Sequence, residues 1–138
     1  MKKCLSAFFS IAAAFFLFSG CAGPGVQDWT LSLTDGYEIW RINSQEIVLG
    51  RKENESLTPI VEADVIAYFM SGSYIGVQQT PTGAESGAGT NYYLLNTKLG
   101  SLYGPFDEAA FAAQCKTSGV KQSGWISTRP APEGAKYG

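Results

Sequence analysis

The sequence predicts an α+β domain, an antiparallel β-meander with one helix late in the chain. Three observations lead to this class. Apolar and polar residues alternate with a period of two in short runs between residues 29 and 103, turn-forming residues separate these runs, and the periodicity becomes helical after residue 106. The alternative fold is a small β-barrel that carries the helix as a plug or lid.

Short strands account for most of the predicted domain. Residues 29–33 alternate as a strand, and Asp35-Gly36 after them is a favoured hairpin pair. Residues 51–59 are polar and are expected to form a loop. Further strands are expected at 37–42, 46–51, 61–70, 74–79, 92–96 and 101–103.

The run 61–70 is the most apolar of these segments and is typical of a central strand buried on both faces. Strict alternation places Val65 and Phe69 on one face and Tyr68 on the other. Residues 79–91 are rich in Gly, Thr, Ser and Pro and predict a long mobile loop. Gly104-Pro105 is expected to end the sheet.

The helix is predicted from its end signals. Asp107 is a good N-cap, and Phe106 and Phe111 occupy the two positions of a hydrophobic staple. Gly119 is a natural stop. Cys115 lies on the apolar face of this helix, where a thiol acts as a small hydrophobe. After the helix, Val120, Trp125 and Ile126 predict a last apolar segment that returns to the sheet.

The N-terminal residues have the pattern of an export signal. Lys2 and Lys3 precede an uncharged, largely apolar run over residues 5–18, which is too short to span a bilayer as a helix. Small residues follow, and then Cys21. The sequence Leu-Phe-Ser-Gly-Cys at 17–21 resembles the lipobox of bacterial prolipoproteins, although Leu is one position earlier than is usual there.

The lipobox resemblance implies cleavage before Cys21 and lipid attachment, including palmitate, to that cysteine. Two or more acyl chains hold a protein stably at a membrane. Ala22 rather than Asp after the cysteine implies the outer membrane if the organism has two. The alternatives are an ordinary secretory signal and an uncleaved anchor.

These features divide the chain into four expected segments. They are a lipoprotein signal peptide at 1–20, a lipidated tether at 21–27, one α+β domain at 28–126 and a disordered tail at 127–138. After cleavage and lipidation, Cys115 has no thiol with which to form a disulfide within the chain.

Composition excludes several kinds of chemistry. The chain has no His, so Ser-His-Asp and Cys-His nucleophile systems and His-ligated metal sites are excluded. A net charge of −2 gives no basic excess for nucleic acid. The glycines of the 79–91 segment match no phosphate-binding motif. We expect no cofactor and no metal site.

Two groups of residues are candidates for a catalytic or binding site. Glu62 and Asp64 share a strand face two residues apart, which suits an acid–base pair by distance, but solvated edge charges are the better interpretation. The many aromatic residues fill a small core or form a binding platform. Tyr92, Tyr93 and Trp40 are the candidates for contact with a partner.

A second resemblance covers the second half of the expected domain. The run Tyr-Tyr-Leu-Leu-Asn-Thr at 92–97, a glycine-containing turn and Tyr-Gly-Pro at 103–105 before the helix resemble small bacterial lipoproteins with no assigned activity. This resemblance transfers no site residue other than Cys21.

The expected function is that of a lipid-anchored, non-enzymatic envelope protein. Its small domain would bind an unknown envelope protein or a secreted ligand, and its membrane contact would be the lipid. The alternative is a lipoprotein that inhibits a lytic enzyme such as lysozyme. A carboxylate-dependent hydrolase is the third hypothesis.

Overall fold

A computed structural model describes residues 28–82 and 89–138. The predicted signal peptide, the tether with Cys21 and residues 83–88 of the predicted loop lie outside these residues. Within the described part of the chain, no helix is both long enough and apolar enough to cross a membrane.

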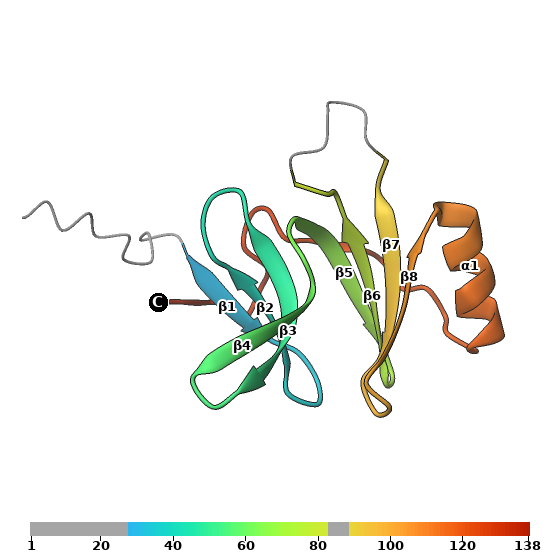
Figure 1. Ribbon diagram of the computed structural model, residues 1–138, viewed down its shortest axis with the longest axis horizontal. Helices are drawn as coiled ribbons and strands as arrows, with labels where there is room; N and C mark the ends of the chain where they lie inside the picture. The colour runs from blue at the N-terminus through green and yellow to red at the C-terminus, as the bar shows by residue number, and fades with distance from the viewer. Residues whose placement is uncertain (1–27, 83–88) are drawn as a thin grey trace, which may run out of the picture.

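In the described residues, two five-stranded antiparallel sheets and one helix form three layers (Figure 1). The first sheet has the order β10-β1-β2-β3-β4, with β1 (Trp29–Ser32), β2 (Tyr37–Arg41), β3 (Ile47–Glu53), β4 (Ser56–Val61) and β10 (Lys136–Tyr137). The second has the order β8-β7-β6-β5-β9, with β5 (Val65–Ser71), β6 (Tyr74–Gln79), β7 (Asn91–Asn96), β8 (Ser101–Phe106) and β9 (Ile126–Ser127). Helix α1 (Glu108–Thr117) covers the outer face of the second sheet. The α+β meander is therefore confirmed, and the barrel alternative is wrong because neither sheet closes.

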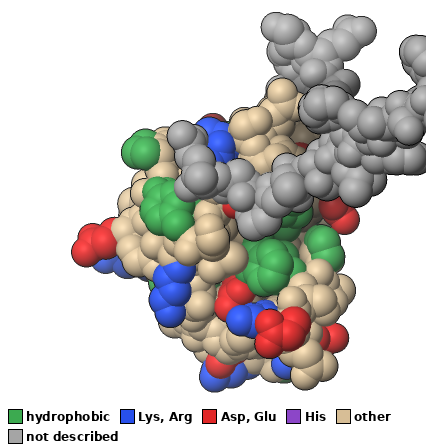
Figure 2. All heavy atoms as spheres, turned by 90° about the vertical axis from the view of Figure 1, so that its left-hand side faces the viewer, with side chains coloured by type: hydrophobic (Ala, Val, Ile, Leu, Met, Phe, Trp, Pro, Cys, Tyr) green, Lys and Arg blue, Asp and Glu red, His purple; other side chains and the backbone are tan. Residues whose placement is uncertain are grey.

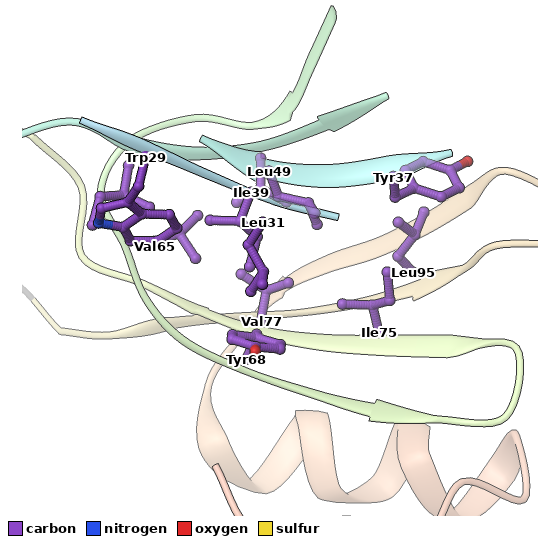
Figure 3. Close-up of a cluster of buried hydrophobic side chains, with 12 residues drawn as sticks. Trp29, Leu31, Tyr37, Ile39, Leu49, Val65, Tyr68, Ile75, Val77 and Leu95 are labelled. Atoms are coloured by element: carbon purple, nitrogen blue, oxygen red, sulfur yellow. The ribbon is translucent and has the colours of Figure 1, made fainter. Parts of the chain in front are cut away.

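The main core lies between the two sheets (Figure 3). Alternate residues of β1 and β2, such as Leu31 and Ile39, point into it from the first sheet. Ile75, Val77 and Leu95 meet them from the second sheet, and all three are fully buried. The period-two pattern thus produces a dry layer between the sheets.

A second core lies between the second sheet and α1. Phe69 and Leu94 of the sheet pack against Phe111 and Cys115 of the helix. Trp125 closes this cluster, with its ring centroid 4.7 Å from that of Phe69. The last apolar segment returns to the second sheet as predicted, where β9 pairs with β5.

Both helix ends are built as predicted. The Asp107 carboxylate accepts a hydrogen bond from the Ala110 N–H at 2.7 Å, which satisfies a free donor of the first turn. Gly119 follows the C-cap with φ +67°, and the Val120 N–H donates to the Cys115 carbonyl at 2.8 Å. This is the hydrogen-bonding pattern of a Schellman motif.

Two strand predictions are wrong. The expected loop 51–59 is instead the β3–β4 hairpin, because its polarity reflects solvent exposure rather than the lack of a strand. The expected strand 61–70 is two strands in different sheets, β4 ending at Val61 and β5 beginning at Val65. An irregularity in β5 then places Val65 and Tyr68 in the same core, against strict alternation.

The structure corrects two further boundaries. Strand β8 continues through Gly104-Pro105 to Phe106, which the fold tolerates because β8 is an edge strand. The expected disordered tail, 127–138, is part of the fold. Thr128 is buried, and β10 pairs with β1. The tail has few apolar residues, so its order depends on backbone pairing that composition does not reveal.

Candidate functional site

The two candidate tyrosines point in opposite directions from β7, as adjacent strand residues must. The Tyr92 ring packs under α1, 5.4 Å from the Phe111 ring. Tyr93 packs against the core between the sheets, and its hydroxyl donates to the Gln79 side-chain carbonyl at 3.4 Å. Burial raises the pKa of Tyr93. Each half-buried ring therefore covers a core.

Trp40 lies on the outer face of the first sheet. Its indole N–H donates to the Glu38 carboxylate, which also accepts a bond from the Ser32 hydroxyl at 3.2 Å. The Lys52 ammonium is 3.9 Å from the same carboxylate. Figure 2 shows the side of the molecule to which this sheet belongs, where hydrophobic side chains stand among charged ones. The structure thus places Trp40 in a polar cluster.

The two candidate carboxylates do not form a pair on one strand. Glu62 and Asp64 lie in the link between β4 and β5, and Glu62 is exposed. Both Asp64 oxygens bind the Arg129 guanidinium, at 2.7 and 3.1 Å, and one of them accepts the Ile47 N–H at 3.2 Å. The Asp64 carboxylate therefore holds the structure together at this point.

A pocket of about 350 Å³ lies at one end of the first sheet. Its floor is a row of side chains across three neighbouring strands, because Trp29 of β1 pairs with both Arg41 of β2 and Tyr137 of β10. Directly paired residues project from the same face of a sheet. The other lining residues are Thr128, Arg129, Pro130 and Ala131.

A wall of the pocket, facing this floor, is formed by the segment that connects β9 to β10 (Figure 1). We call this segment, residues 128–135, the strap. The Thr128 hydroxyl donates to the Val65 carbonyl at 2.8 Å. Arg129 binds Asp64 and also donates to the Ser44 carbonyl at 3.2 Å. The strap is thus joined to both sheets beside the pocket.

The pocket lining combines cationic and apolar groups. Among the described residues that line it, Arg41 and Arg129 are charged and none carries a carboxylate. Trp29, Pro130, Ala131 and Tyr137 supply apolar surface. Guanidinium groups present N–H donors in a planar fork that suits oxyanions. Such a lining can bind an anionic group, but the residues described in it offer no nucleophile other than the Thr128 and Tyr137 hydroxyls.

The sequence did not single out this pocket. Trp29 falls in the first predicted strand, 29–33, but Arg129 and Tyr137 fall in the segment that is expected to be disordered. A tyrosine near the end of a polar segment is the one available signal, since Tyr favours strands.

Cys115 is 2% exposed, and burial raises the pKa of its thiol, which keeps it protonated near neutral pH. Over residues 28–82 and 89–138, no three Cys, Asp or Glu side chains come together as metal ligands.

Comparison with known proteins gives one match. No curated protein and no solved structure matches the chain. A family described as "protein of unknown function (DUF3997)" matches residues 34–124, which is more than half of the chain and includes most of both sheets and α1. The chain therefore belongs to this family.

Proposed function

We propose that this protein is a lipid-anchored protein of the bacterial cell envelope, whose domain binds a chemical group of a partner or ligand in the pocket beside β10. The observation that carries the binding role is the row of Arg41, Trp29 and Tyr137 facing the strap. The anchor rests on the sequence that ends at Cys21.

The state of the candidate reactive groups favours binding over catalysis. A general acid or base must be able to exchange a proton with a substrate. Asp64 has both oxygens bound to Arg129, and the Cys115 thiol is buried under the helix. The groups that line the pocket are mainly donors and apolar surface, which suit recognition.

The anchor would hold the pocket close to a membrane. Trp29 is eight residues after Cys21, and a fully extended chain of that length spans at most about 29 Å. The pocket would therefore lie within reach of ligands at or near the bilayer surface. This location suits a partner in the same membrane, or a ligand that arrives there.

Replacement of the lipidated cysteine tests the anchor. We expect Cys21→Ser to abolish incorporation of labelled palmitate and to move the protein out of the membrane fraction or leave its precursor uncleaved. Cys4→Ser is the matched control, since Cys4 lies in the expected signal peptide and should have no effect on labelling. Labelling that survives in Cys21→Ser would contradict the proposal.

Cross-linking in intact cells tests the binding role. A cross-linked partner should be lost in the Arg41→Gln variant and kept in the Arg51→Gln variant. Arg51 is the control because it lies beside Tyr37, at the end of β2 away from the pocket. A partner captured equally by both variants would place the interaction elsewhere. Inhibition of purified lysozyme by the wild type would support the inhibitor hypothesis instead.

A further inference from the structure

We infer that the pocket recognises the carboxylate of a small organic anion, with the apolar part of that molecule lying against Trp29, Ala131 and Tyr137. This inference rests on the proposed function only in taking the pocket as the binding site. It adds the chemical class of the ligand.

The charge of the lining points to an anion. Its two charged residues, Arg41 and Arg129, are both cationic, although the whole chain has a net charge of −2. Arg129 already binds one carboxylate, that of Asp64, and this carboxylate is not part of the lining. A guanidinium has five N–H donors, and the three bonds of Arg129 to Asp64 and Ser44 leave donors for a ligand.

The apolar lining points to an anion that carries a carbon skeleton. A bare inorganic ion would gain nothing from the Pro130 and Ala131 side chains or from the rings of the floor residues. The volume of about 350 Å³ is at the lower end for ligand pockets, so it fits one small molecule or one end group. The planar carboxylate matches the guanidinium fork in geometry.

Hydrogen bonds within the protein hold the strap in position beside the pocket. Thr128 is 1% exposed and is bonded through its hydroxyl to Val65 and through its N–H to Ile66. Arg129 is fixed at two separate points, Asp64 and Ser44. A preformed site loses little conformational entropy on binding, so even a small ligand can be retained.

The three tryptophans provide an internal control for a binding experiment. Trp29 lines the pocket, Trp40 lies on the outer face of the first sheet, and Trp125 lies under α1. In full-length protein in detergent micelles, labelled with ¹⁵N at the indole nitrogens, the three N–H signals report these places separately. The probe is hippurate, which joins a carboxylate to a benzoyl group. Its neutral primary amide and inorganic phosphate are the comparison ligands.

We expect hippurate to shift the Trp29 signal in a saturable way while the signals of Trp40 and Trp125 stay in place. Arg41→Gln should weaken this binding about tenfold or more, because the lining loses one of its two positive charges. Arg51→Gln should leave it unchanged. The unmoved Trp40 and Trp125 signals also show that each variant is folded.

Three results would overturn the inference. They are a Trp29 signal that hippurate does not move, equal binding of the neutral amide, and an equal response to inorganic phosphate alone. The titration is independent of the anchor. A protein that lacks lipid but binds hippurate would refute only the anchor, whereas a lipidated protein that ignores hippurate would refute only the ligand class.

Discussion

At the scale of single residues, Asp35 connects the two sheets at the end opposite the pocket. It adopts φ +55° in the turn between β1 and β2, a conformation that Asp tolerates better than most residues. Its carboxylate accepts a 2.6 Å bond from the Thr97 hydroxyl and a 2.9 Å bond from the Lys98 ammonium, both in the turn after β7. Both bonds lower the pKa of the Asp35 carboxyl below the ordinary value of 3.8, and the Thr97 bond has the larger effect.

This lowered pKa predicts how stability depends on pH. The folded state binds the Asp35 proton more weakly than the unfolded state, so the contribution is complete above the unfolded pKa, near 4, and is lost as the pH falls through the lower folded pKa. Asp35→Asn should therefore lower Tm at pH 6, and its difference from the wild type should shrink towards pH 2. Thermal melts across this range measure it. Glu55→Gln, in the exposed β3–β4 turn, is the control and should show no such trend.

The thiol of Cys115 gives a second prediction at this scale. Its side chain is 2% exposed beneath α1, and burial raises its pKa, so both access and the thiolate fraction are low. In a Cys4→Ser, Cys21→Ser protein, where it is the sole thiol, we expect Cys115 to react with Ellman's reagent far more slowly than in the same protein in denaturant. Equal rates in the folded and unfolded states would show that the packing under α1 is wrong.

At the scale of elements, α1 is the part of the fold that its own sequence specifies best. The Asp107 cap, the Phe106–Phe111 staple and the Gly119 stop are all local, so each can be recognised within a few residues. The β3–β4 hairpin has no such signal. Alternation predicts its first strand only up to residue 51. The turn at Asn54, with φ +57°, and strand β4 are identified only by the pairing of β4 with β3.

The end of α1 can be tested at Gly119. A Cβ at this position meets no atom within 4 Å, so the cost of Gly119→Ala is the positive φ alone, about 1–2 kcal/mol. Gly124→Ala is a matched control, since Gly124 also has open space around its Cβ position and has no positive φ. Urea unfolding should show a loss for Gly119→Ala and little change for Gly124→Ala. Equal effects would mean that the Schellman geometry does not limit the substitution.

At the scale of the whole molecule, the fold class followed from the sequence but the pocket did not. Alternation identifies a strand and its buried face, but it does not assign the strand to a sheet. For this reason the pattern over 61–70 predicts one strand where the structure has two. The pocket depends on Trp29, Arg41, Arg129 and Tyr137, which are up to 108 positions apart. The pairing of β1 with β2 and β10 and the bonds of Arg129 to Asp64 and Ser44 bring them together.

The strap joins the two sheets around this pocket. The ion pair of Arg129 with Asp64, which attaches the strap, should therefore control the local stability of the strap rather than the global stability of the fold. The Arg129 and Asp64 side chains are 40% and 19% exposed, so water screens their attraction, and Arg129→Gln should cost only about 1 kcal/mol of global stability. We expect hydrogen exchange at residues 128–137 to rise about tenfold while β6 and β7 keep their protection. Lys98→Gln, which removes the ion pair with Asp35 at the other end, should leave the strap unchanged.

A double-mutant cycle separates this pair from other effects of the substitution. If Arg129 acts on the strap mainly through Asp64, then Asp64→Asn with Arg129→Gln should destabilise less than the sum of the single changes. Additive effects would show instead that Arg129 holds the strap through its hydrogen bond to the Ser44 carbonyl. Exchange that rises equally in both sheets would show that the strap does not open separately, and that the pocket forms and disappears only with the whole fold.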